Sequence, residues 1–427
     1  MSQGRYYNSE LVNTVYVVNP INTAITASGT TSTDAFGRLR VSNPFTLFDT
    51  SHRYVDNGNW FESTAAGGST TFDSNAGLLD MTVTTASGSQ VLRETKKVFN
   101  YQPGKSLLAI LSFNFEEAQN NLRQRIGYFG SENGFYLELD GNNLPSFVKR
   151  SSVTGSLVET KVSQNNWNID PLDGTGPSGL SLDLTKVQIL WFDFEWLGSG
   201  TVRCGFIING LYIHCHSFQH ANVTVGTYIT TASLPLRVEI INTNTTESNS
   251  TLKQICATVI SEGGYEIRGS SAEAKLPIGS PRDLALASTE YPVISLRLKS
   301  NKLDGIAVLD SLNVLGISNN ANYCWEIVQG GTTSGGNWST TNNSSLVEYN
   351  ITATGYSLGD GEVLTAGYTV GSNQGSTTAE LQRDNLFEYQ LQRNSFTSTP
   401  VELILIASTD TAGADVLASL GWQETNR

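Results

Sequence analysis

Short runs of apolar residues, separated by turn-forming residues, follow one another along most of the chain and predict β-strands. Between residues 49 and 268 the separators are mainly Gly, Asn and Asp, and Asp140-Gly141-Asn142-Asn143 is typical of a hairpin turn. The clearest strand patterns cover residues 79–84, 107–115, 134–139, 187–197, 202–208 and 237–241. Strands at this spacing favour a β-sandwich or jelly roll over residues 49–268.

The last third of the chain repeats this pattern with a different sequence. Apolar and polar residues alternate over 294–299 and again over 415–423, and residues 401–407 are apolar on both faces. We therefore expect a second β-sandwich over residues 286–427. Residues 269–285 have the Pro, Gly and Ser content of a linker. Residues 379–392 depart from the strand pattern and predict a short amphipathic helix.

Residues 1–48 predict an extended N-terminal arm, because large side chains are too sparse there to form a core. Such a segment buries too little surface to offset the roughly 1–2 kcal/mol of backbone entropy lost per ordered residue. Apolar side chains and two arginines gather at its end, with Arg and apolar residues alternating on opposite faces. We expect these residues to attach the chain to a neighbouring subunit: Phe36, Arg38, Leu39, Arg40, Val41, Phe45 and Phe48.

Composition supports an all-β protein and narrows its partners. The chain holds 46 Ser, 45 Thr, 36 Asn and 40 Gly, with only 15% charged residues, which disfavours long helices. Its net charge is -13 and no basic stripe is present, so we expect no nucleic-acid partner. No apolar run is long enough to span a membrane, and the N-terminus lacks the apolar core of a secretory signal.

The four cysteines show no metal-ribbon spacing. Cys204 and Cys215 lie on successive predicted strands and can pair across a hairpin, whereas buried free thiols are the favoured interpretation.

Residues 191–196, Trp-Phe-Asp-Phe-Glu-Trp, are the strongest candidate for chemistry. As a strand they place Trp191, Asp193 and Glu195 on one face, where an aromatic ring beside two carboxylates can bind carbohydrate. A retaining glycosidase needs two carboxyl groups about 5–5.5 Å apart. In the Glu-x-Asp-x-x-Glu pattern of one family of sandwich glucan hydrolases, the last acid falls here on Gly198. We therefore assign no catalytic residue, and a purely structural strand remains the simplest interpretation.

Two patterns are compatible with metal ions without establishing a site. His214 and His216 share one face of a regular strand, with His220 nearby, and supply two of the three or four ligands that zinc needs. Asp170 and Asp173 lie in a turn-rich loop and offer oxygen ligands of the kind calcium prefers. Neither set is complete, so we assign no metal and no cofactor.

Four segments resemble virion structural proteins of tailed bacteriophages, a group frequent among phages of marine bacteria and cyanobacteria. The resemblance begins with Thr33-Asp34-Ala35-Phe36-Gly37-Arg38-Leu39-Arg40-Val41-Ser42 and continues to Asp49. It includes residues 168–179, 205–222 and 415–422 in the same order, so that it extends over nearly the whole chain. It implies a structural part of the particle, with no catalysis assigned to these motifs.

We therefore expect a non-enzymatic component of a tailed-phage virion, made in the host cytoplasm: a fibre, spike or decoration protein on head, neck or tail. It would bind other virion proteins (capsid, neck or tail) through its arm. A homotrimer is favoured by analogy with phage fibres. The alternative is a receptor-binding lectin for host surface polysaccharide, and a polysaccharide depolymerase is less favoured. Polysaccharide binding requires Trp191 to be exposed, whereas polysaccharide hydrolysis requires a second acidic residue opposite it.

Overall fold

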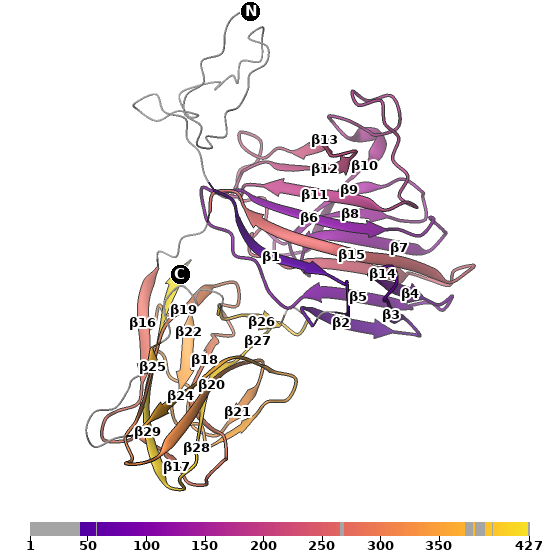
Figure 1. The fold of residues 1–427 in the computed structure, drawn as a ribbon. Helices are drawn as coiled ribbons and strands as arrows, with labels where there is room; N and C mark the ends of the chain where they lie inside the picture. The colour runs from indigo at the N-terminus through magenta and orange to yellow at the C-terminus, as the bar shows by residue number, and fades with distance from the viewer. Residues whose placement is uncertain are drawn as a thin grey trace, which may run out of the picture. The chain divides into compact units, whose positions relative to one another are not determined.

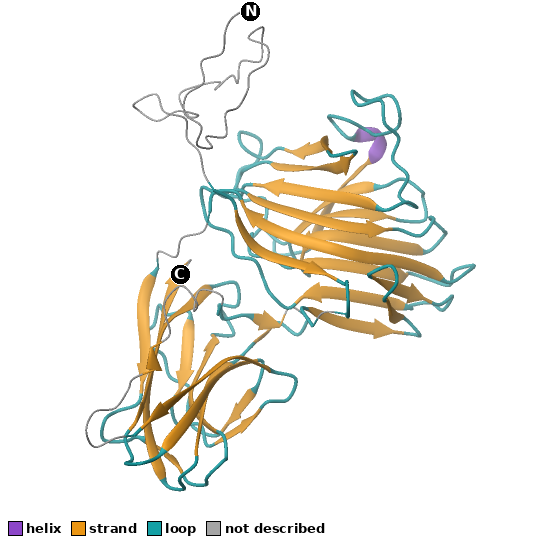
Figure 2. Cartoon of the chain, viewed as in Figure 1, coloured by secondary structure: helices purple, strands orange, loops and turns teal. Residues whose placement is uncertain are grey.

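The computed structural model describes residues 43–56, 58–264, 269–371, 379–380, 389–394 and 396–425. Residues 44–427 form one compact unit. The fold is all-β, as predicted: strands dominate, and the single helical element among the described residues is a 3-10 turn at Gln164–Asn166 (Figure 2). No helix in this part of the chain has the length and apolarity needed to span a bilayer.

The first sandwich consists of two antiparallel sheets (Figure 1). Within the described residues, one sheet has eight strands in the order β13-β12-β11-β6-β15-β4-β3, with β1 also paired to β15. Its bounds are β1 (Phe45–Ser51), β3 (Ser69–Asp73), β4 (Leu78–Val83), β6 (Leu107–Asn114), β11 (Gln188–Phe194), β12 (Val202–Ile208), β13 (Leu211–Phe218) and β15 (Ser250–Ser261).

The facing sheet has seven described strands in the order β10-β9-β8-β7-β14-β5-β2. Its bounds are β2 (Trp60–Ala65), β5 (Gln90–Thr95), β7 (Leu122–Phe129), β8 (Gly134–Leu139), β9 (Ser146–Ser151), β10 (Val158–Ser163) and β14 (Leu236–Asn242). Alternate side chains of both sheets form one core, in which Phe192 and Leu190 of β11 are buried in the same cluster as Phe135 and Val238. The period-2 pattern of the sequence therefore decides which residues enter this core.

The second sandwich also packs two sheets around its own core. In the described residues their orders are β16-β29-β19-β25, with β17 paired to β29, and β22-β18-β28-β20-β24. Two further strand pairs, β21–β23 and β26–β27, complete the set. The bounds are β16 (Ser270–Lys275), β17 (Arg282–Leu284), β18 (Tyr291–Leu298), β19 (Ile306–Gly316), β20 (Asn322–Gln329), β21 (Thr332–Ser334), β22 (Val347–Asn350), β23 (Gly355–Ser357), β24 (Glu362–Val370), β25 (Ala379–Glu380), β26 (Arg393–Asn394), β27 (Thr399–Pro400), β28 (Leu403–Thr409) and β29 (Ala414–Thr425).

The expected linker over residues 269–285 is corrected by the structure. Strands β16 and β17 lie within it, and both pair with β29. Ala274 and Leu284 are buried in the second core, and this burial stabilises the ordered conformation of the stretch. At the expected helix, residues 379–380 form β25 instead, and residues 381–388 lie outside the described residues.

The end of the expected arm also contributes to the first sandwich. Strand β1 begins at Phe45, and the Phe48 ring packs 5.1 Å from the Phe99 ring and 6.4 Å from the Trp60 ring. Phe48 therefore stabilises its own domain, whereas Phe45 is 40% exposed. The other candidate attachment residues, Phe36, Arg38, Leu39, Arg40 and Val41, lie outside the described residues.

Candidate functional site

Strand β11 presents two of the three residues singled out in the sequence. Leu190, Phe192 and Phe194 enter the core, and Trp191 and Asp193 lie on the opposite face, as the alternation predicts. The strand ends at Phe194, so Glu195 falls beyond it and does not line the same surface. Glu195 is exposed, and its main-chain oxygen accepts a hydrogen bond from Tyr228 Oη at 2.8 Å. The predicted trio is therefore reduced to a pair.

Trp191 is not the exposed ring that glycan binding was expected to need. It is only 5% exposed, and its Nε1 donates to the Phe206 carbonyl oxygen at 3.3 Å. The rings of Tyr212 and His214 lie 5.8 and 5.7 Å from it. Tyr212 is 55% exposed, so the accessible aromatic surface belongs to Tyr212, supported from below by Trp191.

A shallow hollow of about 440 Å³ opens beside these rings; we call it the Tyr212 hollow. Asp193 forms an ion pair with Arg203, its direct neighbour on β12. His214 Nε2 lies 2.9 Å from Ser217 Oγ, and burial lowers the pKa of His214. The residues that define the hollow are Ser106, Leu108, Trp191, Asp193, Arg203, Tyr212, His214 and Glu262.

Sequence reasoning missed the other aromatic and charged side chains of this hollow, which are Tyr212, Arg203 and Glu262. Tyr212 stands two residues before His214, so strand alternation alone was enough to find it. Predicting that Arg203 lies beside Asp193 required the register between β11 and β12. Glu262 follows β15 and is more than sixty residues from Asp193 in the sequence, so no local pattern connects the two. Glu262 supplies a second carboxylate in the hollow, a position for which the sequence motif offered only Gly198.

The three histidines do not form a metal site, and a β-bulge is the reason. Cys204 pairs with His216 and the next residue, Gly205, pairs with His214, so Cys215 is an extra residue on β13. A bulge of this kind breaks the alternation of faces. His214 lies outward on Trp191, whereas the His216 ring lies in the core, 6.4 Å from the Phe147 ring and stacked with it. The expectation that His214 and His216 share a face is therefore wrong.

His220 occupies a third environment. Its Nδ1 donates to the Gly200 carbonyl oxygen at 2.7 Å, its Nε2 lies 3.1 Å from Lys149 Nζ, and its ring stacks on Tyr228 at 3.9 Å. Burial lowers the pKa of His216 and of His220 to about 4. Among the described residues, no group of three or more His, Cys, Asp or Glu side chains is placed to hold a metal ion.

The aspartate loop is held together by its own backbone. The Asp170 carboxylate accepts hydrogen bonds from the main-chain N–H groups of Leu172 at 2.9 Å and Ser178 at 2.8 Å. Asp173 instead accepts from the main-chain N–H and the hydroxyl of Thr175, at 2.8 and 2.6 Å. The two carboxylates therefore stabilise separate turns and do not converge on one ligand position.

Cys204 and Cys215 are free cysteines buried in the first core. Burial raises the pKa of both thiols, which keeps them protonated and unreactive at neutral pH.

The outer face of the seven-stranded sheet carries a network of paired charges that the sequence did not reveal. Arg125 Nε donates to Glu138 at 2.5 Å, and Arg125 also contacts Glu239 at 3.2 Å and Glu159 at 3.4 Å. Arg150 donates to the same Glu159 at 2.7 Å and lies 5.2 Å from the centre of the Phe129 ring.

Burial alone would raise the pKa values of Glu159 and Glu239, yet the neighbouring charges lower both below the usual range. The Tyr136 hydroxyl and the charges of Arg125 and Arg150 act on Glu159, and Arg237 and Arg125 act on Glu239. These two groups are therefore held ionised, which suits a structural network and not a proton donor.

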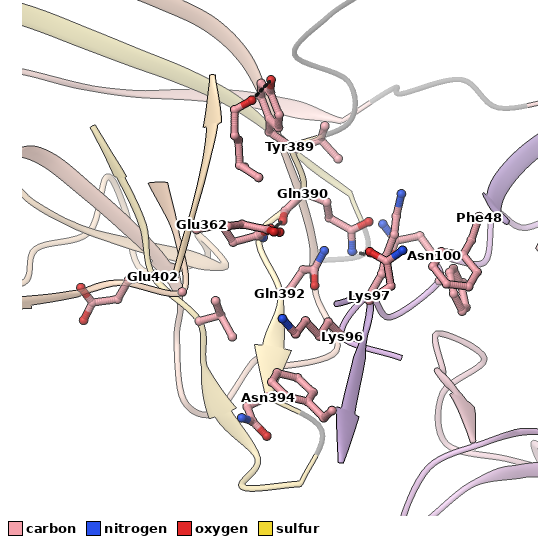
Figure 3. Close-up of a pocket in the computed structure, with 18 of the residues that line it drawn as sticks. Phe48, Lys96, Lys97, Asn100, Glu362, Tyr389, Gln390, Gln392, Asn394 and Glu402 are labelled. Atoms are coloured by element: carbon pink, nitrogen blue, oxygen red, sulfur yellow. Dashed lines mark hydrogen bonds between the residues drawn. The ribbon is translucent and has the colours of Figure 1, made fainter. Parts of the chain in front are cut away.

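A second and larger cavity, of about 680 Å³, also lies within residues 44–427 (Figure 3). Its lining combines side chains from the start of β1, from residues 96–100 and from residues 389–402. Amide side chains are prominent in it, including Asn100, Gln390, Gln392 and Asn394. No motif of the sequence pointed to it, because its walls come from segments as far apart in the sequence as Phe45 and Glu402.

No protein-family model matches the chain, and no curated protein matches it. Among solved structures, it is similar to a β-glucanase of Bacillus licheniformis at 11% identity over 50% of this chain and 96% of that one, with a TM-score of 0.34. It is also similar to the carbohydrate recognition domain of Emp47p, at 10% identity over 55% and 100% of the two chains and a TM-score of 0.31. A legume lectin-like domain of Entamoeba histolytica matches at 10% identity over 49% and 91%, with a TM-score of 0.29. These are likenesses between β-sandwich proteins, and no activity is assigned from them.

Proposed function

We propose that the chain is a non-enzymatic structural component of a tailed-bacteriophage particle, and that it binds glycan of the host surface through the Tyr212 hollow. The observation that carries the glycan part is the Tyr212 ring, 55% exposed and backed by a buried tryptophan, beside polar groups of both signs. An apolar ring face contacts the C–H face of a sugar, and ionised side chains form strong hydrogen bonds with its hydroxyls.

The same hollow is less suited to cutting a glycan. A retaining glycosidase uses one free carboxylate as nucleophile and a second carboxyl group as proton donor. Asp193 is engaged by the Arg203 guanidinium, which lies directly across from it on β12. Glu262 supplies the second carboxylate, but Asp193, which would have to act as the nucleophile, is already paired with Arg203. Binding without hydrolysis is therefore the function we favour.

The glycan proposal is tested by measuring binding of the full chain to polysaccharide extracted from the host envelope. Tyr212→Ala should weaken binding at least tenfold, because the accessible ring is lost while Trp191 stays in place. Tyr368→Ala is the matched control, since Tyr368 is 81% exposed on β24 of the second sandwich. Equal binding by wild-type and a folded Tyr212→Ala protein contradicts the proposal. Release of reducing sugar that stops in Glu262→Gln would show an enzyme instead.

The particle proposal rests on the sequence resemblance and on the composition of residues 1–48. Mass spectrometry of gradient-purified particles should detect the chain at a constant ratio to the capsid protein. Deletion of residues 1–32 should leave a folded protein that is no longer incorporated, because the arm is proposed to carry the attachment. Normal incorporation of the truncated chain would place the attachment surface on a sandwich.

A further inference from the structure

The 680 Å³ cavity, which we call the amide cavity, has the size of a small-molecule site. Pockets that bind small ligands and cofactors typically enclose about 300–1,000 Å³ and combine apolar walls with a few fixed polar groups. Here the apolar surface comes from rings such as Phe48, Phe61 and Tyr389. The polar groups are the feature that indicates the ligand.

Gln390 is held in one orientation at the wall of this cavity. Its side chain is 7% exposed, and its Nε2 donates to Asn100 Oδ1 at 3.0 Å and to the Val98 carbonyl oxygen at 3.5 Å (Figure 3). Its main-chain oxygen accepts from Gln329 Nε2 at 3.1 Å. With both N–H groups used, Gln390 Oε1 accepts no hydrogen bond from any described residue. The result is an oriented acceptor that is available to a ligand.

Gln392, two residues further along the same segment, adds a donor and an acceptor. Its main-chain oxygen accepts from the Val401 N–H at 2.9 Å, whereas its side-chain amide has no partner among the residues the structure describes. Gln390 and Gln392 both line the cavity, so the segment presents two amides to the same space (Figure 3).

Charged groups of opposite sign line the cavity without pairing with one another. Lys96 comes from the first sandwich, and its Nζ lies 5.8 Å from the centre of the Phe61 ring. Asp360 and Glu362 come from the second sandwich. Within the described part of the chain, none of these three side chains takes part in an ion pair. Both signs therefore remain available to a bound molecule.

This mixture of charges selects against ionic ligands and for neutral ones with hydroxyl groups. A ligand of either charge would meet like charges as well as opposite ones, because Lys96 and the carboxylates line the same space. A hydroxyl group both donates and accepts, so it can donate to Glu362, accept from Lys96 and bond to an amide in either direction. A molecule with many hydroxyls and apolar C–H faces can form hydrogen bonds with the charged and amide groups and can pack against the aromatic rings.

We propose that the amide cavity binds a neutral oligosaccharide, at a site separate from the Tyr212 hollow. The proposal stands on the lining of this cavity and does not depend on glycan binding by Tyr212. Gln390 and Gln392 orient the sugar hydroxyls, Lys96 and Glu362 bind them from the two sandwiches, and the aromatic rings contact the apolar sugar faces.

The test uses the full chain with maltotriose, cellotriose and triacetylchitotriose as probes, followed by saturation-transfer NMR and titration calorimetry. At least one trisaccharide should bind, and Gln392→Ala and Glu362→Gln should each raise its dissociation constant at least tenfold. Neither residue is in the core, so both variants should melt as the wild-type protein does. Glu273→Gln is the control, since Glu273 is 62% exposed on β16 and, among the residues the structure describes, forms an ion pair only with Lys275.

Tyr212→Ala separates this proposal from the previous one, because it should leave trisaccharide binding at the amide cavity unchanged. The proposal is overturned if no probe binds. It is equally overturned if Gln392→Ala and Glu362→Gln both leave the dissociation constant of the trisaccharide unchanged. The same holds if Tyr212→Ala is the one variant that abolishes trisaccharide binding.

Discussion

Gly205 lies directly opposite Trp191 on the neighbouring strand β12, and the absence of a side chain there makes room for the indole ring. A Cβ at position 205 would stand 2.9 Å from Trp191 Cζ2 and 1.9 Å from the Ile213 carbonyl oxygen. Both approaches are closer than van der Waals contact permits. The ring that supports Tyr212 therefore depends on one glycine of the next strand.

Gly205→Ala should destabilise the protein by about 1–3 kcal/mol, since an added methyl group in a packed site forces side chains and backbone to move. It should also weaken glycan binding, because Trp191 positions Tyr212. Urea denaturation measures the first effect. Gly279→Ala is the control, since a Cβ at that exposed turn meets no atom within 4 Å. Equal stability of the two variants would show that strand β13 adjusts freely.

Arg125→Met should destabilise the protein by about 1.5–3 kcal/mol, because Glu138 and Glu239 lose their shared buried cation and keep Lys161 and Arg237 as close partners among the described residues. Lys275→Met removes an exposed partner of Glu273 and should change stability by less than about 1 kcal/mol. Chemical denaturation of both variants compares the two effects. If the Arg125 variant is as stable as the Lys275 variant, the network contributes nothing to folding.

Acid should destabilise the protein before the carboxylates titrate. The pKa values of His52, His216 and His220 are lowered from 6.5 to about 4, in each case mainly by burial. Between these values the unfolded chain binds more protons than the folded one, so stability is lost as pH falls from about 6.5 towards 4. Each histidine contributes up to about 1.4 kcal/mol per pH unit in that window.

Thermal midpoints recorded between pH 7.5 and 5 measure this loss. His216→Gln removes one titrating group and should give a shallower pH dependence, whatever its effect on the midpoint at pH 7.5. An unchanged slope in this variant would mean that folding does not lower the pKa of His216.

Thiol titration should distinguish the cysteines by burial. Cys256 is exposed and should react within seconds in the native protein, whereas Cys204 and Cys215 should react only after unfolding. Cys256→Ser should remove the fast phase. Four reactive thiols are expected in denaturant without a reductant, and a count of two would indicate a disulfide.

Light scattering of the purified chain should give the mass of a trimer, as analogy with phage fibres predicts. A chain that stays monomeric at micromolar concentration would contradict this expectation, while leaving the two glycan-site proposals untouched.

The sequence by itself determined the class of the fold and the inner faces of most strands. Trp191, Phe192 and Asp193 alternate between the two faces of β11 because side-chain direction in a regular strand is a local property. The sequence pattern also located β11 and β12 to within a few residues of their observed bounds. It mistook β16 and β17 for a linker, since short edge strands among Pro, Gly and Ser resemble turns until their pairing with β29 is known.

Only the tertiary structure decided which chemical groups meet. The bulge at Cys215 separates His214 from His216, and it lies opposite Gly205 of another strand, where the two backbones approach closely. Both candidate sites draw their residues from segments far apart in the sequence, such as Asp193 with Glu262 and Lys96 with Glu362. Such meetings depend on strand register and sheet order, which are set by the packing of the whole core and are not encoded in any single segment.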